Sequence, residues 1–110
     1  MTNSYQTQKF AAARSALMLP HPNGEAESIA IAFHEIHHAL HQFDRSRVND
    51  GSAIKWLDVV DALMDATGIV DPDGQGLALL KARRLTTEEK FGLSKAVDEL
   101  AHWFQRESNE

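Results

Sequence analysis

Residues 24–44 read GEAESIAIAFHEIHHALHQFD, and this stretch carries the clearest helical pattern in the chain. Its large apolar residues recur at steps of four, three, four and three positions: Ile29, Phe33, Ile36, Leu40 and Phe43. At about 100° of rotation per residue, these side chains fall within about 40° of one direction, which is typical of a helix that buries one face. We therefore predict a central helix that begins after Asn23 or Gly24, ends near Asp44, and has Phe33 and Leu40 in the middle of its buried face.

The opposite face of this predicted helix is rich in histidine. His34, His38 and His41 project about 120–180° from the apolar direction, His37 lies between the two faces, and Glu35 lies about 120° away, on the solvent side. Residues 34–38 also match the pattern H-E-x-x-H. In that pattern, two histidines one turn apart bind zinc and the glutamate acts as general base. The match defines a candidate metal site with Glu35 as its candidate catalytic residue.

A catalytic zinc site needs a third protein ligand, which either His41 or Asp58 could supply. The structural context of such enzymes is missing, because no strand is predicted before the helix and no glycine follows His38 to bend the chain toward a metal. We therefore expect a solvated surface rather than an active site. Binding of a transition metal by His34 and His38 without catalysis is the intermediate hypothesis, because the two residues are one helical turn apart.

Length and composition indicate one globular domain that spans residues 1–110. The chain has 110 residues, of which 43% are hydrophobic and 25% charged, so it is large enough to bury a single core. We expect the polar ends, residues 1–4 and 106–110, to be disordered. The chain has no cysteine, so disulfides and thiolate metal sites are excluded and histidines and carboxylates remain as the candidate ligands.

The charge and the hydropathy pattern favour a cytoplasmic protein. The first ten residues are polar and resemble no signal peptide, and no apolar run is long enough to span a membrane. The formal net charge of -5 opposes general adhesion to nucleic acid or to anionic lipid. We therefore expect neither a membrane nor a nucleic acid as partner.

Four further segments show helical rather than strand patterning. We predict helices over residues 5–18, over residues 53–68 with Ser52 as N-cap, over residues 77–85, and from Thr86 onward. Thr86 and Glu89 form a capping box that opens the last of these, in which apolar residues again recur at steps of four, three and four. The predicted fold is all-α, a compact single-domain bundle of four to five helices with antiparallel neighbours.

The remaining charged clusters have simpler interpretations. Three aspartates form an acidic stripe along one predicted helix: Asp58, Asp61 and Asp65. Three basic residues end another: Lys81, Arg83 and Arg84. Residues 71–74 resemble part of a calcium loop but lack its third acidic ligand and its terminal glutamate, which favours an ordinary turn. We expect solvated helix flanks in the first two cases.

The sequence therefore favours a small interaction or regulatory protein, such as an adaptor, an inhibitor or an accessory factor. We expect no catalytic activity and no cofactor, and a partner that is another protein, with a homodimer left open. The alternative is a zinc-dependent hydrolase that uses residues 34–38.

Overall fold

A computed structural model describes residues 4–108, and within them it contains helices and no strand. The elements are α1 (Ser4–Ala16), α2 (Glu25–Leu40), the short 3₁₀ helix η1 (Arg45–Arg47), α3 (Gly51–Met64), α4 (Leu77–Arg84) and α5 (Thr87–Ser108). The predicted all-α bundle is confirmed. Of the ends expected to be disordered, Ser4 and residues 106–108 are helical, and residues 1–3 and 109–110 lie outside the described part of the chain.

The helix starts follow from local capping chemistry. The predicted capping box is confirmed, because the backbone N–H of Thr86 donates to Glu89 Oε1 at 2.8 Å and the N–H of Glu89 donates to Thr86 Oγ1 at 3.1 Å. The predicted Ser52 cap of α3 is wrong. Asp50 occupies that position, and its carboxylate accepts from the backbone N–H groups of Ser52 and Ala53. The helix therefore begins at Gly51, two residues before the predicted start.

The end of α2 also differs from the prediction. The helix stops at Leu40, because His41 is extended and Gln42 adopts a left-handed conformation with φ of 66°. This turn changes the direction of the chain, and the ring of Phe43, which lies beyond the helix, makes a T-shaped contact with the ring of Phe104. Phe43 thus joins the core as the apolar spacing predicted, but by a turn rather than by continued helix.

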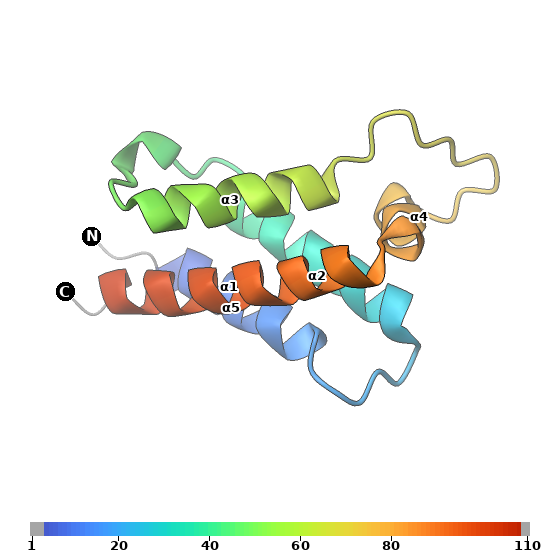
Figure 1. The fold of residues 1–110 in the computed structure, drawn as a ribbon, viewed down its shortest axis with the longest axis horizontal. Coiled ribbons are helices and arrows are strands. Elements are labelled where there is room, and N and C mark those ends of the chain that lie inside the picture. The colour runs from blue at the N-terminus through green and yellow to red at the C-terminus, as the bar shows by residue number, and fades with distance from the viewer. Residues whose placement is uncertain (1–3, 109–110) are drawn as a thin grey trace.

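Helices that are distant in sequence make much of the bundle. α1 packs against both α2 and α5, while α3 packs against α5 and α4 packs against α2. In Figure 1, α3 and α5 run side by side along the long axis in opposite directions, and α1 and α2 cross behind them. The pairs α1–α2, α1–α5 and α3–α5 are antiparallel. The longer connections, residues 41–50 and 65–76, allow α3 and α4 to reach partners other than their sequence neighbours.

The core lies where α1, α2, α3 and α5 meet. Its largest fully buried side chains are Phe10, Phe104, Ile36, Leu93, Leu100, Val60 and Val97. Within the described residues, no buried side-chain nitrogen or oxygen lacks a hydrogen-bond partner. No helix of the described chain is both long enough and apolar enough to cross a membrane.

Candidate functional site

The histidine-rich face of α2 lies on the surface, opposite the buried stripe. Ile29, Phe33 and Ile36 point into the core, so the rotation of the helix leaves the histidines outside. All four are exposed: His34, His37, His38 and His41. The orientation predicted for this helix is therefore the one observed.

The ring contacts within this face join His37 to its neighbours. The ring centroids of His37 and His41 are 5.8 Å apart with a 29° angle between their planes, and those of His37 and His38 are 6.2 Å apart. His41 is the C-cap residue of α2, and its backbone N–H donates to the carbonyl of His37 at 2.9 Å. The closest ring contact on this face thus occurs at the C-terminal end of the helix, whereas the H-E-x-x-H pattern predicts a pair of His34 with His38.

Glu35, the candidate general base, faces α1 rather than open solvent. Its side chain is 24% exposed, and its Oε2 lies 3.4 Å from Nζ of Lys9. The sequence places Glu35 on the solvent side of the helix, because the helical pattern alone does not reveal that α1 packs against α2. The carboxylate therefore has a structural partner.

Among residues 4–108, no three histidine or carboxylate side chains are grouped so that they could hold one metal ion. Asp58, the alternative third ligand, belongs to the surface of α3, beside Arg45 of η1. Arg45 forms a bidentate ion pair with Asp61. Its Nη1 donates to Asp61 Oδ2, and its Nη2 donates to Asp61 Oδ1 at 2.9 Å. These hydrogen bonds, with smaller help from the charges of Asp61 and Asp58, raise the pKa of Arg45.

The other charged clusters are tied to local structure. The carboxylate of Asp65 accepts from the hydroxyl and the backbone N–H of Thr67, which lowers its pKa and caps the turn after α3. Asp71 accepts from the backbone N–H groups of Gln75 and Gly76, both at 2.8 Å. An internal pattern of this kind is typical of a turn that needs no cation. Of the basic cluster, Arg83 donates to Gln75 at 2.6 Å.

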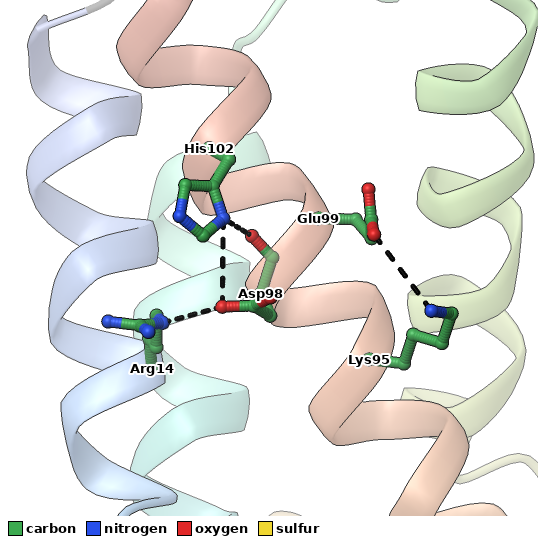
Figure 2. Close-up of polar contacts among 5 residues, drawn as sticks. All are labelled: Arg14, Lys95, Asp98, Glu99 and His102. Carbon is green, nitrogen blue, oxygen red and sulfur yellow. Dashed lines mark hydrogen bonds and ion pairs between the residues drawn. The ribbon is translucent and has the colours of Figure 1, made fainter.

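A second surface lies between α1 and α5. Nε of Arg14 donates to Asp98 Oδ1 at 2.7 Å, and Nδ1 of His102 donates to the backbone carbonyl of Asp98 at 2.9 Å. Figure 2 shows this group bridging the two helices, with the Lys95–Glu99 pair on the other flank of α5. The Asp98 carboxylate, 3.6 Å from Nδ1 of His102, lies between two basic side chains.

Beside this polar bridge is a hollow of about 200 Å³ with a largely apolar lining. Its walls are Arg14, Leu17, Met18, Ser94, Val97 and Asp98. Phe91 lies on the same face of α5, one helical turn before Ser94, and is 72% exposed. The sequence contains the signal for this residue: Phe91 lies about 200° around the helix from Leu93, the first residue of the buried stripe. Phe91 is nevertheless not among the candidate residues that the sequence patterns single out.

These features define a small all-α protein with a histidine-rich helix face and an apolar hollow between its first and last helices. Protein-family models, curated proteins and solved structures were all compared with the chain, and none matches it. Its function has therefore to be inferred from its own surface.

The substitution Glu35→Gln separates the structural role of this carboxylate from a catalytic one. We expect it to lower the free energy of unfolding by no more than about 1 kcal/mol, because a partly exposed ion pair contributes little. Urea denaturation followed by circular dichroism measures this change. Under the hydrolase hypothesis the same substitution removes the general base and abolishes hydrolysis while zinc stays bound. Zinc-dependent cleavage of a peptide library by the parent protein, lost in Glu35→Gln, would contradict our expectation.

Proposed function

We propose that this protein is a non-catalytic interaction or regulatory protein of the cytoplasm. It binds an amphipathic helix of a partner protein against the hollow between α1 and α5. The observation that carries the proposal is the exposure of three large apolar side chains, one of which lines the hollow while the other two lie close to lining residues in the sequence. Phe91, Leu19 and Met18 are 72%, 83% and 56% exposed, respectively.

The exposed apolar side chains of this surface are of the types found at protein–protein interfaces. Aromatic and methionine side chains are enriched at protein interfaces, where a few of them provide most of the binding energy. Met18 lines the hollow directly, Leu19 follows it in the chain, and Phe91 lies one helical turn before the lining residue Ser94. A groove between two packed helices suits a third helix, which inserts apolar side chains spaced three or four residues apart.

The charges around the hollow favour an apolar partner face. Arg14 is paired with Asp98, and Lys90 of α5 is paired with Glu25 of α2. The hydrogen bond from Lys90 lowers the pKa of Glu25. Because these charges are compensated within the chain, affinity has to come from apolar contact rather than from net charge.

Site-specific photo-crosslinking tests this proposal. A benzophenone amino acid at position 91 should crosslink to one defined protein in the source cells. The same probe at position 54 should not, although Ile54 is also exposed and apolar. Position 54 lies near the start of α3, at the opposite end of the long axis from the start of α5 (Figure 1). The crosslinked protein is then purified and its affinity for the parent protein is measured by titration calorimetry.

We expect Phe91→Glu to weaken that binding by about thirtyfold or more, the loss typical of an interface hot spot. Ile54→Glu is the matched control and should bind like the parent. Both substitutions are on the surface, so the free energy of unfolding should change by no more than about 0.5 kcal/mol. A crosslink to a second copy of this chain would show that the partner is the protein itself and that it forms a homodimer. Equal crosslinking at both positions, or equal affinity of Phe91→Glu and the parent, would refute the proposal.

A further inference from the structure

The rings of the α2 histidines have no hydrogen bond or ion pair with any described residue. This distinguishes them from His21, whose ring is hydrogen-bonded to Ser28, and from His102, whose ring is hydrogen-bonded to Asp98. An exposed imidazole with both nitrogens available can coordinate a metal without breaking a protein contact. The three histidines of α2 and its C-cap His41 are therefore the chemically available ones.

Within this group, the ring positions single out one pair. Two zinc–nitrogen bonds of about 2.0–2.1 Å at a tetrahedral angle would hold the two ring centroids about 5 Å apart. The centroids of His37 and His41 are 5.8 Å apart and their planes differ by 29°, so a small rotation of the side chains brings two nitrogens onto one ion. The backbone already fixes their spacing, because the N–H of His41 donates to the carbonyl of His37.

The end of the helix favours a cation at this place. The last carbonyl groups of a helix carry the negative end of its dipole, which stabilises positive charge nearby. His37 lies in the last turn of α2 and His41 is its C-cap, whereas His34 lies one turn farther from that end. Lys9 of α1 lies beside this part of α2, and its charge is compensated by Glu35.

We propose that His37 and His41 form a two-histidine site for a borderline transition-metal dication, such as Zn²⁺ or Ni²⁺, at the C-terminal end of α2. Imidazole is a preferred ligand of these ions, whereas Mg²⁺ and Ca²⁺ prefer oxygen. Two protein ligands leave positions open for water or for ligands from another molecule. The site joins the last turn of α2 to the left-handed turn at Gln42, so a bound ion stabilises this chain reversal. It is independent of the hollow between α1 and α5.

Titration calorimetry of the untagged protein with ZnCl₂ in excess Mg²⁺ tests the site. We expect binding with one ion per chain, or with one per two chains where two copies complete the four ligands of zinc. His37→Ala and His41→Ala should each weaken binding by about tenfold or more, which corresponds to about 1.4 kcal/mol. His34→Ala, which removes an exposed histidine from the same helix, is the matched control and should bind like the parent. Zinc should also raise the melting temperature of the parent and of His34→Ala, but not of His37→Ala.

Circular dichroism without metal checks that each variant folds, and His37→Gln replaces His37→Ala if the latter loses helicity. Three results would overturn the site. The first is an affinity for Zn²⁺ that both His37→Ala and His41→Ala leave unchanged. The second is an equal loss in His34→Ala, which would mean adventitious binding by any surface imidazole. The third is displacement of Zn²⁺ by Mg²⁺, which would indicate carboxylate ligands instead.

Discussion

We expect Phe104→Ala to lower the free energy of unfolding by about 3–5 kcal/mol, the range typical of emptying a buried phenylalanine site. Phe104 is fully buried and stacks on Phe10 of α1, with ring centroids 5.1 Å apart. Its ring also makes T-shaped contacts with the rings of Phe43 and Trp103, whose centroids are 5.4 and 4.9 Å away. Aromatic pairs of this kind add about 0.5–1.5 kcal/mol each beyond the burial of their area. One truncation thus loosens α1, α5 and the segment after α2 together.

Urea denaturation followed by far-ultraviolet circular dichroism measures this loss, and the slope of the transition shows whether unfolding stays two-state. Phe91→Ala is the matched control, because it removes an equal side chain from the surface of the same helix and should change stability by no more than about 0.5 kcal/mol. For a domain whose total stability is about 5–15 kcal/mol, the core variant should lose a large share of it. Equal transition midpoints for the two variants would contradict the assigned core.

The helices could be predicted because each carries its own signal. The period of Ile29, Phe33 and Ile36 specifies both a helix and its buried face, since only one rotation buries all three. The capping box of Thr86 and Glu89 is equally local, because both hydrogen bonds lie within one turn. Local patterns of this kind can be recognised without knowing which other segments the helix packs against.

The partners of each helix could not be predicted in the same way. An apolar stripe on α3 specifies that it is covered but not by which element, and the structure covers it mainly with α5. The partial burial of Glu35 could not be predicted for the same reason. Its position on α2 is solvent-facing for an isolated helix, and only the packing of α1 brings Lys9 beside it. Nonlocal packing therefore limits what the periodic pattern reveals.

The histidine face was predicted in part. The rotation of α2 correctly placed His34, His38 and His41 outside the core. It assumed, however, that the helix continues to Asp44, which would leave His41 on a regular turn. The helix ends at Leu40 and Gln42 turns the chain, but the backbone N–H of His41 still donates to the carbonyl of His37, as in a continued helix, and the two rings stack. The spacing of four residues between His37 and His41 therefore already predicts that the two rings are neighbours, although the H-E-x-x-H pattern pairs His34 with His38 instead.

Phe33→Ala should also cost about 3–5 kcal/mol, whereas Leu40→Ala should cost no more than about 2 kcal/mol. The sequence places both residues in the middle of the buried face, but the structure separates them. Phe33 is 3% exposed, at the centre of α2, whereas Leu40 is only partly buried as its last residue. A central site is enclosed on all sides and leaves a cavity when it is emptied, while a site at a helix end can relax or admit water. The two variants are compared in the same urea titration with the parent protein. A larger loss in Leu40→Ala than in Phe33→Ala would show that the buried centre of α2 lies nearer to the histidine end, and the orientation of this helix in the bundle would then be wrong.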